Sequence, residues 1–202
     1  MKDGVLRLGR FEPASAALGP GLRSGVWVQG CRRRCRGCTS PELLSSGGSA
    51  DEVTITELFA RIQTAQRQRG TEGVTFSGGE PFEQAGAVAS LARRLRASGL
   101  SVIAWSGRTI EELRSSGDSG VRRLLGELDV LIDGPYIERL KCDDQPMRGS
   151  SNQRIIFLSG RYRREDFLEQ IVEMRHEDER ISSVGVADPR AINAVFRMFG
   201  IA

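Results

Sequence analysis

The sequence predicts an α/β fold built on an open parallel sheet of about six strands. Apolar segments alternate with amphipathic ones through most of the 202 residues, which is typical of βαβ units with right-handed crossovers. About six strands are too few for the eight of a closed barrel. An open partial barrel and a doubly wound sheet both fit, and in both the ligands gather at the carboxyl ends of the strands.

The first elements of this pattern lie before residue 100. Residues 24–28 (SGVWV) predict a short strand that leads into a cysteine-rich loop. Residues 55–66 place their apolar side chains on one helical face. Residues 73–76 (GVTF) predict the next strand, and residues 83–97 a helix that ends at Gly99, where a C-cap glycine is expected.

The later elements continue the alternation. Residues 100–105 predict a strand and residues 109–113 a helix, and residues 128–132 and 154–158 predict two buried strands. Residues 164–175 carry apolar side chains at helical spacing and predict a further helix.

The C-terminal end of the chain completes the set. Residues 181–186 predict a strand, and residues 188–199 a last helix opened by Asp188-Pro189. No domain boundary is visible, so residues 1–202 are expected to form a single domain.

Composition narrows the class of protein. The content of 39% hydrophobic and 27% charged residues is that of a soluble globular protein. The N-terminal residues 1–7 lack the apolar core of a signal peptide, and no apolar run approaches a membrane span. We therefore expect a cytoplasmic protein without a membrane partner. A net charge of +3 is too small to indicate nucleic-acid binding.

Three cysteines within eight residues form a C-x3-C-x2-C pattern: Cys31, Cys35 and Cys38. Structural zinc requires four ligands, and a 4Fe-4S cluster normally takes four cysteines. The remaining thiol, Cys142, is isolated in the sequence, and the sole histidine, His176, lies in a charged run expected on a helix surface. Three ligands favour an iron–sulfur cluster with one exchangeable iron position over a closed zinc site.

A second motif follows the strand at residues 73–76. In Ser77-Gly78-Gly79-Glu80-Pro81, the two glycines allow the backbone to approach a ligand, and Glu80 supplies a carboxylate for a cationic group. This motif and the loop at residues 30–41 both follow strands, so we expect both at the same edge of the sheet. A tight turn between a strand and a helix would explain the glycines equally well.

Together these two motifs resemble the radical S-adenosylmethionine superfamily. The segments at residues 19–23 (GPGLR) and 27–31 (WVQGC) are similar to those of the glycyl-radical-enzyme activases. Gly37 before the last cysteine, with the segments at residues 129–135 and 148–155, is similar to the branch that activates anaerobic ribonucleotide reductase. The core motifs extend over residues 19–156, and residues 157–202 form a βα extension.

This resemblance implies a fold, two cofactors and a reaction. The fold is a partial (open) parallel (β/α) barrel, and the cofactors are a 4Fe-4S cluster and S-adenosyl-L-methionine. The open iron binds the amino and carboxylate groups of S-adenosylmethionine, and one electron cleaves it to methionine and a 5′-deoxyadenosyl radical. That radical removes a hydrogen from a backbone glycine of the partner, a glycyl radical enzyme. The cofactors carry this chemistry, so no side chain is assigned a separate catalytic role.

The resemblance also assigns residues. The cluster ligands are the three clustered cysteines, and Glu80 with the Gly78-Gly79 backbone holds the methionine amino group. Further cofactor contacts are expected from Gly37, Ser106 and Asp133. Thr39-Ser40 stands where the branch has an aromatic-Asn pair, and Trp105-Ser106 where Tyr-Thr is more typical; these departures bear on the identity of the partner.

Other functions remain open. A radical maturase or biosynthetic enzyme acting on a peptide or metabolite shares the same motifs, because fold and cofactor do not determine the substrate. A non-enzymatic iron–sulfur electron carrier or a zinc module is a third possibility, against which the Gly-Gly-Glu segment argues. The four arginines among the cysteines are either a solvated loop or a docking surface for an acidic electron donor such as flavodoxin or ferredoxin: Arg32, Arg33, Arg34 and Arg36.

Overall fold

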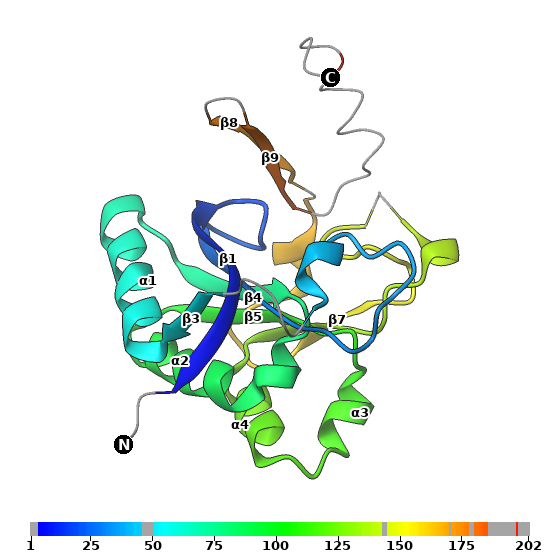
Figure 1. Cartoon of the computed structure of the whole chain (residues 1–202), viewed down its shortest axis with the longest axis horizontal. Coiled ribbons are helices and arrows are strands. Elements are labelled where there is room, and N and C mark those ends of the chain that lie inside the picture. The colour runs from blue at the N-terminus through cyan, green and yellow to red at the C-terminus, as the bar shows by residue number, and fades with distance from the viewer. Residues whose placement is uncertain are drawn as a thin grey trace.

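A computed structural model of the chain describes residues 4–45, 51–142, 145–169, 171–177, 180–185 and 197 (Figure 1). Within these residues, seven strands form one sheet in the order β3-β1-β2-β4-β5-β6-β7, and two more form a hairpin. The strands of the sheet are β1 (Val5–Ser15), β2 (Arg23–Val28), β3 (Asp51–Thr54), β4 (Gly73–Gly78), β5 (Ser101–Trp105), β6 (Val130–Asp133) and β7 (Arg154–Phe157).

The centre of the sheet is parallel and its margins are antiparallel. Strands β2, β4, β5 and β6 pair in parallel, whereas β1 pairs antiparallel with β2 and β3, and β7 antiparallel with β6. The strand order has two ends, so the sheet is open. The predicted open α/β architecture with a parallel core is therefore confirmed, with more strands than expected.

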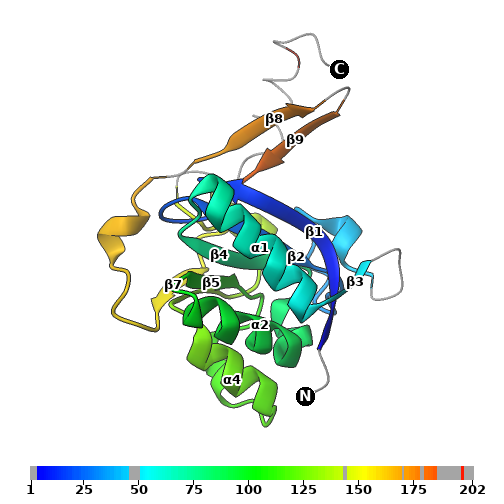
Figure 2. The same ribbon diagram turned by 90° about the vertical axis from the view of Figure 1, so that its left-hand side faces the viewer.

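Helices cover one face of the sheet (Figure 2). They are α1 (Ile55–Arg69), α2 (Ala85–Ala97), α3 (Ile110–Arg114) and α4 (Ser119–Glu127). Their buried side chains join alternate residues of the central strands, such as Val74 and Phe76, in one apolar core. Helix α2 follows a short 3-10 helix, η2 (Pro81–Gln84). The expected helices at residues 55–66, 83–97 and 109–113 all lie within these elements.

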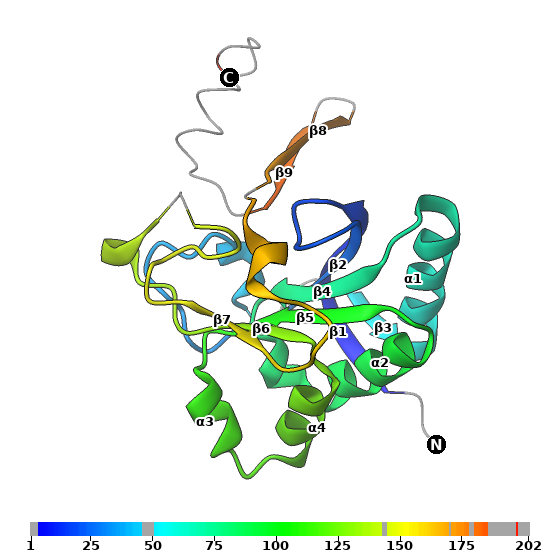
Figure 3. The ribbon, with the colours of Figure 1, turned by 180° about the vertical axis from the view of Figure 1, so that it is seen from behind.

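No α-helix in the described part covers the opposite face, which is crossed by the segment that carries the 3-10 helix η4 (Arg164–Phe167) (Figure 3). There, Ile103, Val130 and Ile132 pack against Met147 and Phe167, which come from segments outside the strands. Because β2, β4, β5 and β6 run parallel, the loops that follow them lie around a common edge of the sheet.

The C-terminal part differs from its prediction. The expected helix at residues 164–175 is wrong: a 3-10 turn, η4 (Arg164–Phe167), is followed by a hairpin of β8 (Glu173–Glu177) and β9 (Arg180–Val184). Phe167 makes edge-to-face contacts with Phe157 and Tyr162, at centroid distances of 5.6 and 5.9 Å. This aromatic cluster holds η4 against the sheet, and the pairing of β8 with β9 replaces the hydrogen bonds of the expected helix.

Some elements were missed or lie outside the described residues. Strands β1 and β3 and helix α4 had no counterpart in the prediction, and β7 is a half-exposed edge strand, not a buried one. His176 lies in β8, opposite Ile181, and not on a helix. The last helix, at residues 188–199, falls almost wholly outside the described residues. No helix in the described part is long and apolar enough to span a membrane.

Candidate functional site

The loops after β2 and β4 are bonded to each other at the carboxyl edge of the sheet. The Gly79 amide donates to the Val28 carbonyl at 2.8 Å, and the Glu80 amide to the Gly30 carbonyl at 2.9 Å. Gly78 has a φ of 99°, and a Cβ there would lie 2.6 Å from the Val28 amide nitrogen. A Cβ at Gly79 would overlap the Gly30 carbonyl oxygen. The two glycines thus bring the backbones of both loops together, as their expected common edge requires.

The cysteine loop starts from this contact. Its first residues are held by short 3-10 helix η1 (Pro41–Leu43): the Gly30 amide donates to Leu43 at 2.8 Å and the Cys31 amide to Leu44 at 3.1 Å. The loop then turns back on itself, with the Cys38 amide 3.2 Å from the Cys35 carbonyl. Gly37, at φ 72°, provides the left-handed residue of that turn.

The three thiols share one cavity. Cys31, Cys35 and Cys38 are free and half-buried, and all three line a cavity of about 380 Å³. Burial raises the pKa of Cys31, against the backbone N–H groups of Arg33 and Arg34, which lower it. Cys142 lies elsewhere, with its Sγ 3.6 Å from the Gln145 side-chain oxygen.

Glu80 is the buried acid of the same cavity and is 2% exposed. Its Oε1 accepts hydrogen bonds from the Phe82 amide at 3.1 Å and from the Ser106 hydroxyl at 3.0 Å, and its Oε2 accepts one from the Gly107 amide at 2.8 Å. Burial raises the pKa of this carboxyl, although these three donors lower it. The sequence-predicted Glu80 and Ser106 are therefore brought into direct contact.

Two predicted contacts lie outside the lining of the cavity. Asp133, at the end of β6, is fully buried and accepts hydrogen bonds from the Arg154 guanidinium at 2.9 Å and the Ile110 amide at 2.7 Å. It thereby caps α3, and its neighbour Gly134 lines the cavity in its place. Gly37 shapes the cysteine turn without lining the cavity.

Several residues that line the cysteine cavity were not predicted from the sequence. Arg10, from β1, and Ser183, from the β8–β9 hairpin, both line the cavity, and Arg10 approaches the Ser183 carbonyl at 3.5 Å. Tyr136 was also missed. The alternation of Leu6 and Leu8 with polar residues was a signal for β1. No local pattern indicated that the hairpin reaches this cavity.

The donor set fits a 4Fe-4S cluster. In the described part of the chain, no three His, Cys, Asp or Glu side chains are grouped closely enough to hold one metal ion. The thiolates of a 4Fe-4S cluster each bind a different iron, so they stand around a cavity instead of meeting at one point. Three thiols around a cavity, with a buried carboxylate beside them, match that requirement.

The chain is similar in sequence to known proteins. Residues 17–156 match the family model described as "4Fe-4S single cluster domain". The chain is 31% identical to the anaerobic ribonucleoside-triphosphate reductase-activating protein of Vibrio cholerae, over 72% of this chain and 94% of that protein. It is 27% identical to the protein of the same name from Escherichia coli, over 74% of this chain and 97% of that protein. Among solved structures, QueE from Escherichia coli is similar, with a TM-score of 0.41 and 13% identity over 64% of this chain and 70% of that one.

Proposed function

Because the chain belongs to the family of 4Fe-4S single cluster domain proteins that includes the anaerobic ribonucleoside-triphosphate reductase-activating proteins, we propose that it installs a glycyl radical on such a reductase. It is a radical S-adenosylmethionine enzyme that uses a 4Fe-4S cluster. The observation that carries this proposal is the shared cavity of the three cysteines and Glu80 at the carboxyl ends of the parallel strands.

The cysteine loop holds the cluster in this proposal. Cys31, Cys35 and Cys38 would hold the 4Fe-4S cluster, and three protein ligands would leave it one exchangeable position for S-adenosylmethionine. When bound, the reduced cluster supplies the electron that cleaves S-adenosylmethionine to methionine and a 5′-deoxyadenosyl radical. The hydrogen bonds from Gly30 and Cys31 to the η1 region keep the loop in place during this reaction.

Glu80 receives the substrate ammonium group. A carboxylate has about four acceptor positions, and three on Glu80 are taken by Phe82, Ser106 and Gly107. By this count one acceptor position remains, and Glu80 lines the cavity. A bound ammonium group also offsets the cost of burying this carboxylate, because an opposite charge nearby favours the ionised form.

Apolar side chains protect the reaction from solvent. Leu18, Trp27, Trp105 and Val184 line the cavity together with the polar groups. A water-poor cavity prevents side reactions of reactive species and strengthens the electrostatic contacts inside it. The chain therefore positions the reactants and excludes water, and the cofactors supply the bond cleavage.

The electron donor is proposed to be an acidic protein such as flavodoxin or ferredoxin. Arg32 and Arg36 carry side chains that are 90% and 93% exposed, and Arg34 is exposed beside them. They belong to the loop that carries the three thiols, so an acidic donor attracted to them comes close to the cluster.

The test is an anaerobic assay with two readouts. The protein is reconstituted with iron and sulfide, reduced with dithionite and given S-adenosylmethionine, and 5′-deoxyadenosine is measured. A purified anaerobic ribonucleoside-triphosphate reductase from the same organism is then added, and its glycyl radical is followed by electron paramagnetic resonance. We expect both products. Cleavage without a glycyl radical would indicate a radical enzyme with another substrate, and no cleavage from a fully loaded protein would overturn the proposal.

A further inference from the structure

The C-terminal segment lies outside the residues that match the family model. The family match ends at residue 156, and the relatives align over 94% and 99% of their own length but only 72% and 76% of this chain. In the described part, this segment carries η4 and the β8–β9 hairpin.

Exposed apolar side chains concentrate in this segment. Four of the six exposed large hydrophobic residues in the described part lie between residues 168 and 174. They form what we term the C-terminal apolar patch: Leu168 (68% exposed), Ile171 (40%), Val172 (37%) and Met174 (38%). Such a concentration on a protein surface is typical of an interaction site.

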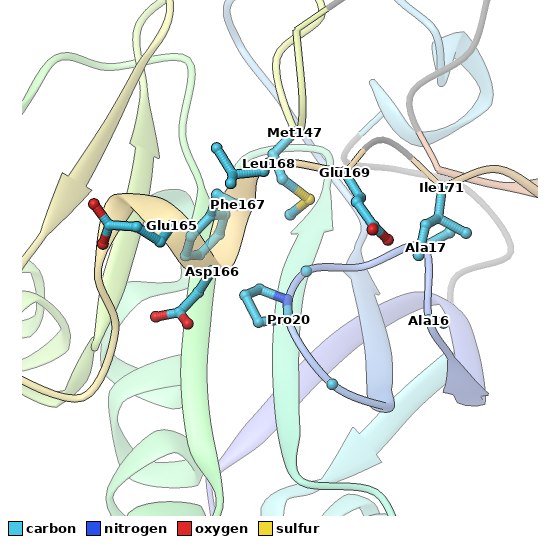
Figure 4. Close-up of a pocket in the computed structure, with 12 residues that line it drawn as sticks. Ala16, Ala17, Pro20, Met147, Glu165, Asp166, Phe167, Leu168, Glu169 and Ile171 are labelled. Carbon is cyan, nitrogen blue, oxygen red and sulfur yellow. The ribbon is translucent and has the colours of Figure 1, made fainter.

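A second cavity, of about 400 Å³, lies beside this patch (Figure 4). One wall is formed by residues 165–169 and Ile171, and the other by the loop that carries Pro20. Three exposed carboxylates line it: Glu165, Asp166 and Glu169. Asp166 accepts a hydrogen bond from the Arg163 amide at 2.7 Å, whereas neither Glu165 nor Glu169 forms an ion pair with another described residue. This second cavity is therefore lined by both apolar and acidic side chains, and we term it the acidic outer cavity.

The same segment also reaches the cysteine-lined cavity. Ser183 and Val184 line that cavity, and Val184 packs in a cluster with Ala17, Leu18 and Trp27. The hairpin is anchored by the Glu173 carboxylate, which accepts a hydrogen bond from the Ala16 amide at 2.7 Å. The patch is thus continuous with the mouth of the candidate active site.

We propose that the C-terminal apolar patch and the acidic outer cavity form the docking surface for the reductase, and that they receive a segment of it with apolar and basic side chains. This inference rests on the proposed function, because it names where that partner binds. The acidic lining favours a basic partner segment. A self-complementary contact between two copies of the chain would bring the same carboxylates together, so a second copy fits less well.

The apolar part is tested with a triple variant, Leu168→Ser, Ile171→Ser and Met174→Ser. Its matched control is Val5→Ser, since Val5 is 50% exposed in β1. The dissociation constant for the purified reductase is measured anaerobically. We expect it to rise at least about tenfold for the triple variant, as for the loss of central interface contacts, and to stay unchanged for the control.

The acidic part is tested with Glu165→Lys together with Glu169→Lys. Asp51→Lys with Glu52→Lys, on exposed positions of β3, makes the same change in net charge elsewhere. Only the first pair is expected to weaken binding, and its affinity should fall less steeply with added salt than that of the wild type.

The outcomes separate this inference from the proposed function. Formation of 5′-deoxyadenosine without the reductase tests the radical chemistry alone. If the wild type performs both reactions and the patch variants bind the reductase normally, the docking surface is overturned and the proposed function stands. If light scattering shows that the triple variant abolishes a dimer, the patch is occupied by a second copy, which also overturns the inference.

Discussion

The Glu80 carboxylate accepts a hydrogen bond from the Ser106 hydroxyl at 3.0 Å, and this bond joins the loop after β4 to the loop after β5. The Ser106 oxygen in turn accepts a hydrogen bond from the Arg108 amide at 3.0 Å. Both side chains are buried at the carboxyl edge of the parallel strands. The position of the one buried acid of the cavity therefore depends on a neighbouring strand as well as on its own loop.

Ser106→Ala should destabilise the protein and weaken substrate binding. The change leaves the Arg108 amide without its partner and removes one donor from Glu80, at a cost of about 1–3 kcal/mol. Urea unfolding should show this loss, and the KM for S-adenosylmethionine should rise. Ser115→Ala, at an exposed serine, should change stability by less than about 0.5 kcal/mol. Equal stability of the two variants would contradict the role given to Ser106.

Arg154→Met should reduce the dependence of stability on acid pH. Hydrogen bonds from Arg154 lower the pKa of Glu111 from 4.5 to about 2. A carboxyl with a lowered pKa stabilises the fold above its unfolded value, and this stabilisation is lost as the pH falls toward about 2. The variant lacks this contribution, so its unfolding free energy should change less than that of the wild type between pH 4.5 and about 2.

At neutral pH the same variant tests the partnership with Asp133. Without Arg154, the fully buried Asp133 carboxylate loses its ion pair, and we expect a loss of about 3 kcal/mol. Arg69→Met, at an exposed helix end, is the control. An unchanged pH profile for Arg154→Met would contradict the assignment.

Removal of each clustered cysteine should abolish the cluster. Cys31→Ala, Cys35→Ala and Cys38→Ala each leave two protein thiolates, too few to retain the cubane with an open iron. Iron and sulfide content after anaerobic reconstitution is the measurement, with 5′-deoxyadenosine formation as the second readout. Cys142→Ala should retain the cluster, because this thiol lies outside the cavity lining. Loss of the cluster from Cys142→Ala alone would make the ligand assignment wrong.

Local signals in the sequence were sufficient for the parallel core and for the loops at its edge. The buried strands are short apolar runs, and the glycines and cysteines that follow them are distinctive. Strand β1 was missed because its sequence mixes Leu6 and Leu8 with arginines, although it pairs antiparallel with both β2 and β3. The helical spacing at residues 164–175 was misleading, because the chain forms only the short 3-10 helix η4 there and then enters the β8–β9 hairpin.

For the site, too, the sequence motifs indicated the main residues but not the contacts between distant parts of the chain. The motifs indicated Glu80 and the cysteines, but nothing in their spacing indicated that Glu80 would bond to Ser106, or that Asp133 would pair with Arg154. The contact between Arg10 and Ser183 joins residues 173 positions apart. Such contacts depend on the assembled fold, so local patterns do not contain them.

Neutral substitution of Arg32, Arg34 and Arg36 should slow reduction by an acidic donor. We spare Arg33, because its side chain is only 31% exposed and pairs with Glu112 at 2.7 Å, whereas those of Arg32 and Arg36 are 90% and 93% exposed. The rate of cluster reduction by flavodoxin should fall about tenfold or more at low ionic strength and converge with the wild-type rate at high salt. Reduction by dithionite should be unaffected. Equal flavodoxin rates at low salt would exclude the arginines as a docking surface.

Gly79→Ala should separate the two loops that form the site. The new Cβ overlaps the Gly30 carbonyl oxygen, so the backbone must shift and the bond from the Glu80 amide to Gly30 is strained. Forcing a methyl group into a packed contact costs about 1–3 kcal/mol, and the cysteine loop is displaced with it. Gly117→Ala is the matched control, since a Cβ there has no heavy atom within 4 Å. We expect Gly79→Ala to lower both the unfolding free energy and the cluster content, and Gly117→Ala to change neither. If Gly79→Ala were less stable but kept a full cluster, the contact with Gly30 would serve the fold and not the position of the cysteines.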